Sequence, residues 1–251
     1  MPARHDLRDK RALVTGGTRG IGRAIVEEFV ELGAHVLVVA RDVTGLVAHE
    51  RVTGVAADVA VAADRARIVE AARAGGALHV LVHNAGTNVR APLVDYDDAT
   101  IERLIGLDLT APLLLSRDLH PLLRAAGGAS VVHISSVAGQ LALPTGVAYA
   151  AAKAGLEQAA RTLALEWARD RIRVNTVAPW YTRTPLVEPV LARAEALAAI
   201  VARTPLGRIA EPHEVAAAVA FLAGDGASYI TGHCLNVDGG MSIQGLAPGQ
   251  R

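Results

Sequence analysis

Short apolar segments alternate with longer segments of helical periodicity along most of this 251-residue chain. Several apolar segments are nearly continuous in Val, Leu and Ile, which is typical of parallel strands covered on both faces. The segments predicted as strands are Ala12–Thr15, His35–Ala40, Val52–Ala56, Leu78–His83, Ala129–Ile134, Arg173–Val177 and Cys234–Val237. Helical spacing predicts helices at Ile21–Leu32, Asp64–Ala74, Ala99–Ala125, Ala148–Asp170, Glu188–Ala202 and Glu211–Gly224.

This alternation predicts the α/β class: a single-domain Rossmann fold with a doubly wound parallel sheet of about seven strands and helices on both faces. No repeat, low-complexity stretch or linker divides the chain, so we expect residues 1–251 to form one domain. Residues 1–10 are expected to form an N-terminal arm and residues 247–251 a polar tail. The Pro- and Thr-rich segment 182–208 is the best candidate for a mobile lid over the substrate.

Composition excludes several classes of function. Twenty-five basic and 25 acidic residues cancel and are interspersed, and aromatic residues make up 3% of the chain, so we expect no binding to nucleic acid or anionic membranes. No apolar stretch approaches eighteen residues, and residues 1–10 lack the apolar core of a signal peptide. The single cysteine, Cys234, fits a reducing compartment, and we expect a cytoplasmic location. The nine histidines lack metal-ligand spacing, so no metal site is expected.

A glycine-rich turn joins the first predicted strand to the first predicted helix. It contains Gly16, Gly20 and Gly22, in the spacing Gly-x-x-x-Gly-x-Gly. Free backbone amides at a helix N-terminus favour a pyrophosphate, and glycines let the backbone approach the phosphates. The turn therefore predicts a dinucleotide site; the alternative is a tight turn that binds nothing.

Tyr149 and Lys153 are four residues apart in a predicted helix, and Ser136 lies thirteen positions before Tyr149, at the end of an apolar run. Residues at i and i+4 lie on one helical face, so the ammonium can lie beside the phenol. A neighbouring cation favours the phenolate, and a phenol in this setting can exchange a proton with a substrate oxygen. A chance helical pair is the alternative, and the nucleotide-binding turn argues against it.

Together these motifs resemble the short-chain dehydrogenase/reductase family. The turn is similar to its Thr-Gly-x-x-x-Gly-x-Gly motif, and His83–Gly86 is similar to its Asn-Asn-Ala-Gly segment, with His83 in place of the first Asn. Val237–Gly240 matches its C-terminal signature, so the resemblance covers essentially the whole chain. Within the family, the tropinone-reductase-like branch is most similar, through the segments Asn84–Arg90, Ala178–Thr184 and Thr204–Arg208. In the second segment, Trp180 replaces a glycine that is common in the family.

The resemblance implies a catalytic group of Ser136, Tyr149 and Lys153, with Asp108 at the position where the family usually has a fourth catalytic residue, an Asn. Asp108 could be ionised and paired with Lys153, or protonated, and a carboxylate lacks the amide donor. The implied coenzyme-binding residues are Gly16, Thr18, Arg19, Gly20, Ile21, Gly22, Arg41, Asp58, Val59, Asn84, Gly86, Tyr149, Lys153, Pro179, Thr182 and Thr184. The implied substrate-binding residues are Ser136, Val137, Tyr149, Trp180 and Tyr181.

The residues after the second predicted strand favour NADP(H) over NAD(H). NAD-dependent members of the family have an acidic residue at that strand's end, where this chain has Ala40 followed by Arg41. Arg19 in the glycine turn can reach the same ribose, and two guanidiniums suit a 2′-phosphate. The alternative is that Arg41 is solvated and Asp42 reads the 2′-hydroxyl. Asp58 is expected to bind the adenine amino group, or simply to cap a turn.

Three other features have plain interpretations. His133, within a predicted strand, is expected to be a core histidine with a satisfied partner, and Cys234 to be packing rather than a nucleophile. Trp180 and Tyr181 follow a strand's carboxyl end and fit core and substrate-pocket wall equally well.

The resulting hypothesis is an NADPH-dependent carbonyl reductase or alcohol dehydrogenase that interconverts a ketone and a secondary alcohol, with Tyr149 as general acid/base. The alternatives are a 3-oxoacyl-carrier-protein reductase and a non-catalytic NADP-binding relative. The expected partners are a small-molecule substrate and further copies of the chain, in a homotetramer or homodimer. A hydrophobic or cyclic ketone fits the apolar segments around the site, and Arg90 or Arg183 could equally recruit a carboxylate.

Overall fold

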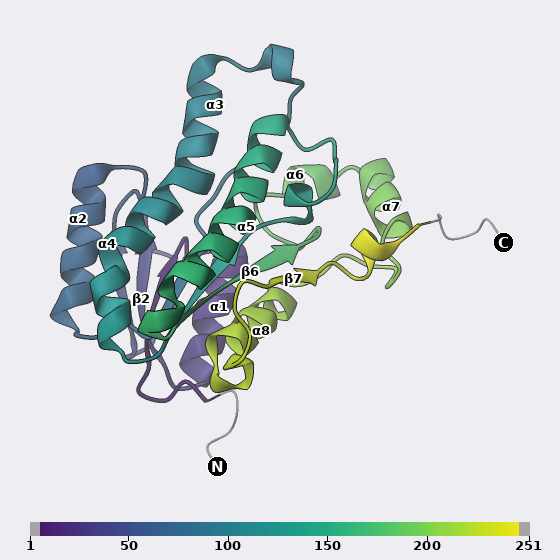
Figure 1. Ribbon diagram of the computed structural model, residues 1–251. Helices are drawn as coiled ribbons and strands as arrows, with labels where there is room; N and C mark the ends of the chain where they lie inside the picture. The colour runs from purple at the N-terminus through teal and green to yellow at the C-terminus, as the bar shows by residue number, and fades with distance from the viewer. Residues whose placement is uncertain (1–5, 246–251) are drawn as a thin grey trace.

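The structure is a computed structural model that describes residues 6–245. Seven parallel strands form one sheet in the order β3-β2-β1-β4-β5-β6-β7 (Figure 1). The predicted tail, 247–251, and the first five residues of the predicted arm lie outside the described residues. The strands are β1 (Arg11–Thr15), β2 (His35–Ala40), β3 (Val52–Ala56), β4 (Val80–His83), β5 (Ala129–Ile134), β6 (Ile172–Pro179) and β7 (Cys234–Val237).

Helices cover both faces of the sheet. One face packs against α1 (Gly20–Glu31) and α8 (Pro212–Ala223), and the other packs against α2 (Ala62–Ala74), α4 (Ala111–Ala125) and α5 (Val147–Trp167). The remaining helices are α3 (Asp98–Ile105), α6 (Glu188–Leu191) and α7 (Ala194–Ala202); a π-helical turn, Gly106–Thr110, joins α3 to α4, and 3₁₀ turns span Leu93–Asp95, Val137–Gly139, Ala168–Asp170, Asp225–Ala227 and Met241–Ile243.

The continuous apolar character of the strands follows from this double cover. On β1, Val14 faces the layer of α1 and α8, while its neighbour Leu13 faces the layer of α2, α4 and α5, and both side chains are fully buried. Burying a side chain of this size contributes about 1.5–3 kcal/mol. The prediction of a doubly wound parallel sheet is therefore confirmed, for the reason that the pattern indicated.

Two predicted helices differ from the observed ones. The segment predicted as one helix at Ala99–Ala125 widens into the π-helical turn at its middle, and Pro112, which follows that turn, has no N–H to donate to the carbonyl of Asp108. The segment predicted at Glu188–Ala202 breaks after Leu191 and resumes at Ala194. Helical periodicity continues through both interruptions, so the sequence pattern did not reveal them.

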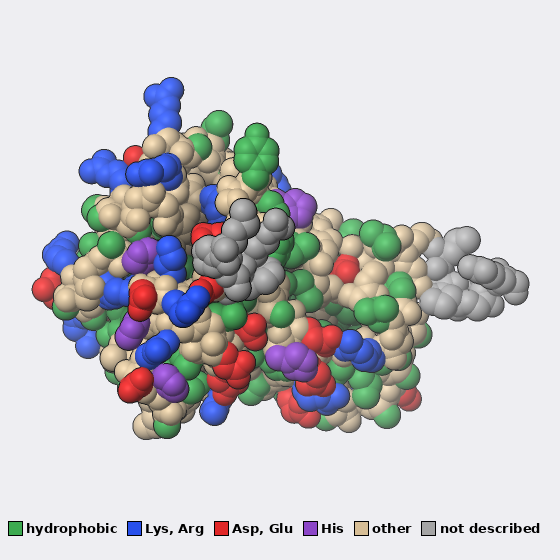
Figure 2. Space-filling model, turned by 90° about the horizontal axis from the view of Figure 1, so that it is seen from below, with side chains coloured by type: hydrophobic (Ala, Val, Ile, Leu, Met, Phe, Trp, Pro, Cys, Tyr) green, Lys and Arg blue, Asp and Glu red, His purple; other side chains and the backbone are tan. Residues whose placement is uncertain are grey.

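The strand order switches direction between β1 and β4: β2 and β3 lie on one side of β1, and β4 to β7 lie on the other. Neighbouring loops diverge at such a point and leave a crevice at the carboxyl ends of the strands. A cleft of about 1440 Å³ lies there. Basic and acidic side chains are interspersed on the face shown in Figure 2. Among the described residues, no helix is long and apolar enough to cross a membrane.

Candidate active site

The glycine-rich turn leaves the N-terminus of α1 open to an anion. Gly16 and Gly20 have φ values of +69° and +56°, which favour glycine. A Cβ on Gly22 would lie 2.2 Å from the carbonyl oxygen of Gly16, so the turn closes tightly only because that side chain is absent. Arg19, the N-cap residue, makes no side-chain capping bond, and the first turn of α1 carries no acidic residue. These are the properties of a phosphate-binding helix N-terminus.

Asn84 and Thr15 hold this turn against the end of β4, a pairing that the sequence did not reveal. The Asn84 amide donates to the backbone carbonyls of Thr15 and Gly16, each at 3.0 Å. The Thr15 hydroxyl in turn accepts from the backbone N–H groups of Asn84 (3.0 Å) and Ala85 (3.1 Å). Asn84 therefore shapes the predicted dinucleotide site through its backbone contacts, besides lining the cleft.

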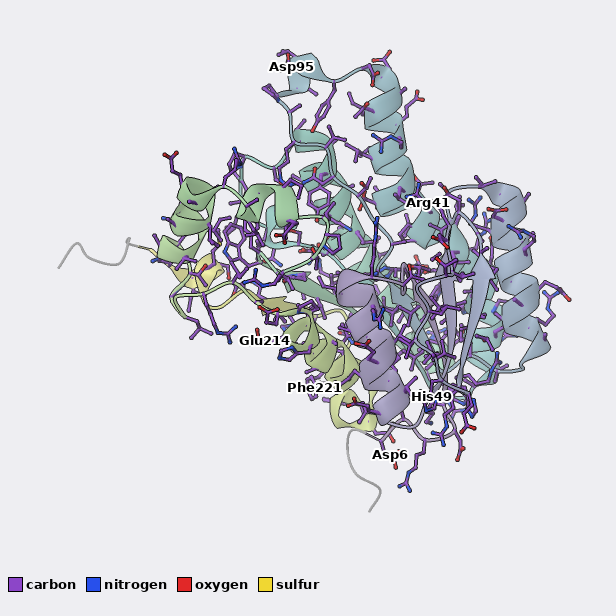
Figure 3. The ribbon with its side chains drawn as sticks, turned by 180° about the vertical axis from the view of Figure 1, so that it is seen from behind. Asp6, Arg41, His49, Asp95, Glu214 and Phe221 are labelled. Carbon is purple, nitrogen blue, oxygen red and sulfur yellow. The ribbon has the colours of Figure 1, made fainter. Side chains whose placement is uncertain are left out.

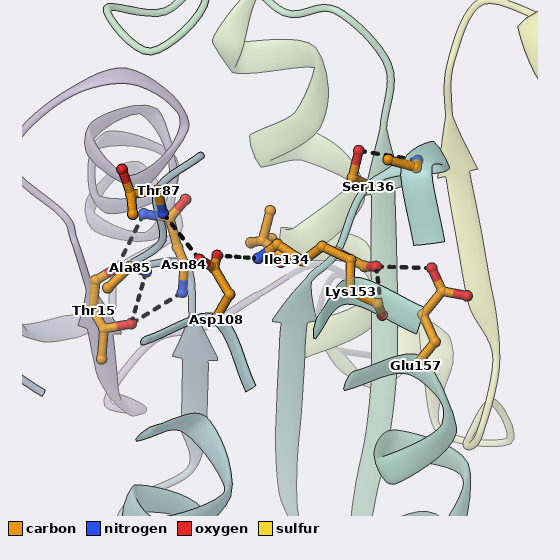
Figure 4. Close-up of polar contacts among 11 residues, drawn as sticks. Thr15, Asn84, Ala85, Thr87, Asp108, Ile134, Ser136, Lys153 and Glu157 are labelled. Carbon is orange, nitrogen blue, oxygen red and sulfur yellow. Dashed lines mark hydrogen bonds and ion pairs between the residues drawn. The ribbon is translucent and has the colours of Figure 1, made fainter. Parts of the chain in front are cut away.

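Tyr149, Lys153 and Ser136 all line the cleft, and the i, i+4 spacing places Lys153 beside Tyr149 as predicted. The Lys153 ammonium lies 5.5 Å from the centroid of the Tyr149 ring and donates to the backbone carbonyl of Ile134 at 3.1 Å. The Ser136 hydroxyl accepts from the backbone N–H of Ala138 at 3.2 Å (Figure 4). Because that bond uses an acceptor lone pair, the serine O–H remains able to donate.

Asp108 lies in the π-helical turn and is completely buried. One carboxylate oxygen lies 3.0 Å from the Lys153 ammonium without an aligned hydrogen bond, and the other accepts from the backbone N–H of Thr87 at 3.3 Å. Gly86 makes room for the pair, since a Cβ there would lie 2.5 Å from Asp108 Oδ1. Burial by itself would lower the pKa of Lys153, but the charge of Asp108 and the neighbouring Tyr149 raise it above its ordinary value. The structure therefore places Asp108 beside Lys153, the partner considered for it in the sequence.

A second buried carboxylate, that of Glu157 on α5, contacts the turn that carries Ser136. It accepts from the Ser135 hydroxyl at 2.8 Å and from the Gln140 amide at 3.3 Å. Burial and the charge of Glu157 raise the pKa of Cys234 to about 12, so this thiol stays protonated and unreactive. The sequence analysis missed Glu157; its signal was an acidic residue at i+4 from Lys153 on a mostly apolar helical face.

His83 and His133 stack under the site, on adjacent strands in register. Their ring centroids are 4.8 Å apart and the rings are nearly parallel. His83 bonds the Ser116 hydroxyl at 2.7 Å, but neither ring nitrogen of His133 has a partner among the described residues. The expectation of a satisfied partner for His133 was therefore wrong: the partner is a stacked ring rather than a hydrogen-bonding group. Burial, with the nearby charge of Lys153, lowers the pKa of His133 to about 3.

Two free guanidiniums lie beside the glycine turn and the end of β2. Arg19 and Arg41 line the cleft, are exposed, and pair with no described residue; Arg41 is labelled in Figure 3. Asp42, the alternative reader of the ribose, accepts from the Thr44 N–H (2.9 Å) and hydroxyl (2.8 Å) through one oxygen, and these bonds lower its pKa. Asp58 lines the cleft and also caps a turn, by accepting from the backbone N–H of Ala60 at 2.9 Å.

Trp180 and Tyr181 form the wall at the opposite end of the cleft. Their rings pack edge to face, with centroids 4.7 Å apart, and the indole N–H donates to the Thr204 hydroxyl at 3.1 Å. They also pack against α6 and α7, so they belong partly to the core, while their contact with substrate stays a prediction. The predicted lid, 182–208, comprises these helices and returns to the wall through a bridge between Thr182 and Ala210.

All but two of the predicted site residues line this one cleft. Gly22 instead packs under the glycine turn. Val137 is buried away from the cleft, and its neighbour Ala138 faces the cleft instead, because the 3₁₀ turn after Ser136 rotates successive side chains. The charged residues Arg90 and Arg203 also line the cleft, whereas Arg183 lies in a separate hollow beside α6 and pairs with Glu211 at 3.1 Å. Among the described residues, no group of acidic, His and Cys side chains could hold a metal ion.

Comparison with known proteins agrees with this geometry. A family model described as enoyl-(acyl carrier protein) reductase matches residues 16–242. A tropinone reductase homologue of Arabidopsis thaliana is 45% identical, over 97% of this chain and 96% of the relative. A tropinone reductase homologue of Datura stramonium is 38% identical, over 97% of this chain and 96% of the relative.

Solved structures with the same fold include complexes with NADP. A gluconate 5-dehydrogenase from Burkholderia cenocepacia, in complex with NADP and tartrate, has a TM-score of 0.91 and 30% identity, covering 96% of this chain and 98% of that chain. The Pseudomonas aeruginosa RhlG/NADP complex has a TM-score of 0.90 and 35% identity, covering 96% of this chain and 99% of that chain.

Proposed function

This chain belongs to the short-chain dehydrogenase/reductase family, and we propose that it interconverts a ketone and a secondary alcohol with NADP(H), using Tyr149 as general acid/base. One observation carries the proposal. The Lys153 ammonium lies 5.5 Å from the centroid of the Tyr149 ring, in the same cleft as Ser136 and the open N-terminus of α1. A proton donor, an oxyanion stabiliser and a dinucleotide site are thus within one cavity.

The residues along the cleft fit NADP(H). The uncapped N-terminus of α1 would hold the pyrophosphate, and Arg19 and Arg41 would hold the 2′-phosphate. Asp42 would have to bind the 2′-hydroxyl of NAD(H), but its carboxylate already accepts two hydrogen bonds from Thr44, which supports NADP(H) over NAD(H). Thr182 and Thr184 would fix the carboxamide, as the family resemblance implies. When bound, the coenzyme supplies or accepts the hydride.

The chain's own residues handle the proton and the developing charge. In reduction, Tyr149 gives its proton to the carbonyl oxygen of the substrate; in oxidation it removes the proton from the alcohol. Ser136 donates a hydrogen bond to the same oxygen; its bond from the Ala138 N–H occupies one acceptor lone pair and leaves the O–H free for this role. The Lys153 ammonium stabilises negative charge on Tyr149, and Asp108 and the carbonyl of Ile134 hold that ammonium in place.

Within this function, we propose that the substrate carries an anionic group. Away from the glycine turn, the cleft is lined by apolar side chains such as Trp180 and Met241 and by four exposed charged ones. Three of these are cations, Arg90, Arg103 and Arg203, and one is an anion, Glu102; none forms an ion pair with a described residue, so the net charge they contribute is positive. Cations in a concave, mostly apolar site attract anions more strongly than they would on an open surface. The gluconate 5-dehydrogenase of the same fold, which binds tartrate, supports a hydroxy or keto acid.

An NADPH-oxidation screen tests the function. The panel contains cyclic ketones, diketones, keto sugars, β-keto acids and their esters, each assayed with NADPH and with NADH. We expect turnover of at least one free ketone. NADPH binding without turnover anywhere in the panel would instead support the non-catalytic relative, and turnover of a carrier-bound β-ketoacyl group alone would support the carrier-linked reductase.

A further inference from the structure

We propose that Glu157 is a positioning residue, which holds the turn carrying Ser136 in register with Tyr149 and Lys153; the proposal rests on the function given above. Tyr149, Lys153 and Glu157 occupy positions i, i+4 and i+8 of α5 and so form one stripe along the helix. The first is the proton donor and the second is its cation. The third, Glu157, contacts the segment 135–140, which contains the catalytic Ser136.

The stripe contacts that segment at successive points. The Lys153 ammonium binds the backbone carbonyl of Ile134, at the end of β5, at 3.1 Å. One oxygen of Glu157 then accepts from Ser135, just before the catalytic serine, at 2.8 Å and from Gln140, four residues after it, at 3.3 Å. Two oppositely charged side chains of one helix therefore hold the strand end and both ends of the serine turn. Figure 4 shows Ile134, Lys153 and Glu157 around Ser136.

Close packing at Gly139 fixes the height of the serine turn above α5, so the hydrogen bonds to Glu157 act on its lateral position. A Cβ on Gly139 would lie 3.0 Å from Glu157 Oε1 and 3.0 Å from the backbone of Lys153 and Ala154. The turn thus rests directly on the helix with no side chain between them. Its lateral position is left to the polar contacts. Two of these, from Ser135 and Gln140, meet at one oxygen of Glu157, and Ser135 also contacts the backbone carbonyl of Lys153 at 3.3 Å.

Gln140 extends the connection to β7. Its amide nitrogen donates to the side-chain oxygen of Asn236, and the Asn236 amide donates back, both at 3.0 Å. Asn236 also donates to the Ser242 hydroxyl at 3.0 Å. Glu157, which is buried and forms no ion pair with a described residue, is the internal end of this network. A buried carboxylate without a cation is costly unless hydrogen-bond donors surround it, and these donors belong to the serine turn and its neighbour strand.

A double-mutant cycle separates positioning from general stability. The rate of a single turnover with NADPH and ethyl acetoacetate is measured for wild type, Glu157→Leu, Ser136→Ala and the double variant. We expect Glu157→Leu to slow the step about 10- to 100-fold, as a misplaced catalytic group does, and to leave the Kd of NADPH within about twofold. In the Ser136→Ala background the same change should have almost no further effect. Equal slowing in both backgrounds, or no slowing at all, would overturn the proposal.

A second measurement does not depend on turnover. Hydrogen exchange of backbone amides 135–141 is followed by mass spectrometry in the ligand-free protein, where the turn is held by the same contacts. We expect faster exchange in Glu157→Leu and in Ser135→Ala, but not in the matched control Glu166→Leu, whose exposed glutamate lies further along α5. Glu157→Gln keeps a carbonyl acceptor and should restore most of the protection. If Glu157→Leu does not fold, Ser135→Ala and Glu157→Gln decide the question, and unchanged exchange in Ser135→Ala refutes the proposal. A protein inactive on the whole panel, but with this exchange pattern, would refute the proposed function alone.

Discussion

The ammonium of Lys153 and the carboxylate of Asp108 lie 3.0 Å apart inside the protein, with side chains 6% and 0% exposed. The pair joins α5 to the π-helical turn between α3 and α4, two elements that are not neighbours in the chain. It fixes the cation beside Tyr149 and also offsets part of its charge. This combination distinguishes the chain from relatives with an Asn at the position of Asp108.

Replacement of Asp108 should separate these two effects. Asp108→Asn leaves a buried ammonium without its carboxylate, so the free energy of unfolding should fall by about 3 kcal/mol at neutral pH. Turnover should be equal or faster, because Lys153 keeps its bond to the Ile134 carbonyl and acts on Tyr149 with its full charge. Urea unfolding and kcat are measured on the same samples. Slower turnover would give the Asp108 carboxylate a role of its own in the reaction.

Removal of the Tyr149 hydroxyl should abolish the chemistry but not coenzyme binding. General acid–base catalysis contributes about 10²- to 10⁴-fold, so kcat of Tyr149→Phe should fall by at least 100-fold. The Kd of NADPH, measured by quenching of protein fluorescence, should stay within about threefold, since the open N-terminus of α1 is untouched. If the variant keeps more than a tenth of kcat, another group is the proton donor.

The coenzyme preference should depend on Arg41. A charge-assisted hydrogen bond contributes about 1.5–3 kcal/mol, so Arg41→Ala should raise the KM for NADPH about 10- to 150-fold and leave that for NADH nearly unchanged. Asp42→Ala is the matched control, because the Asp42 carboxylate is bound to Thr44. A tenfold loss of NADH activity in Asp42→Ala, with no loss of NADPH activity in Arg41→Ala, would reverse the assignment.

An acid and its ester test the proposed anionic substrate. With acetoacetate and ethyl acetoacetate as the pair, Arg90→Ala or Arg203→Ala should raise the KM for the acid about tenfold and leave that for the ester unchanged. Arg193→Ala is the control, because Arg193 is exposed, forms no ion pair with a described residue and does not line the cleft. Turnover of both compounds with equal KM values in wild type would remove the anion from the proposal while leaving the reaction class intact.

The stacked histidines should make the protein sensitive to acid. The pKa of His133 falls from an ordinary 6.5 to about 3 in the folded state. Between those pH values the unfolded chain binds a proton that the folded chain does not, so stability is lost as the pH falls through this range, at up to about 1.4 kcal/mol per pH unit. His133→Val should flatten the dependence of unfolding free energy on pH between 6.5 and 4, and exposed His35→Gln should not. Equal slopes in all three proteins would contradict this account.

Much of the fold and the catalytic group could be predicted, because the signals are local. Strands buried on both faces form apolar runs, and the i and i+4 spacing of Tyr149 and Lys153 places them together on any helix. Ser136 was identified as a candidate because it follows such an apolar run and because the family resemblance implies a serine there. None of these inferences required knowledge of which distant segments touch.

The remaining contacts are long-range, and the sequence does not name the partners: an acidic residue on an apolar helical face marks Glu157 as unusual without showing what it binds. Glu157 matters because Ser135 and Gln140 lie against it from another element, and the stacking of His83 on His133 depends on the register of β4 and β5. The widening of the helix at Asp108 requires knowledge of what its side chain meets inside the protein, which is Lys153. Local periodicity gives the elements; these contacts depend on how the elements are assembled.

The bare backbone at Gly139 has a consequence for attempts to redesign this protein. With 3.0 Å between an added carbon and both Lys153 and Glu157, the gap between the serine turn and its supporting helix is already at its minimum. Any larger side chain there would force the serine turn and α5 to move apart by at least a few tenths of an ångström. Efforts to broaden the range of accepted compounds should therefore leave that side of the cavity alone and reshape the opposite side, where Trp180 and Tyr181 pack against helices at the surface.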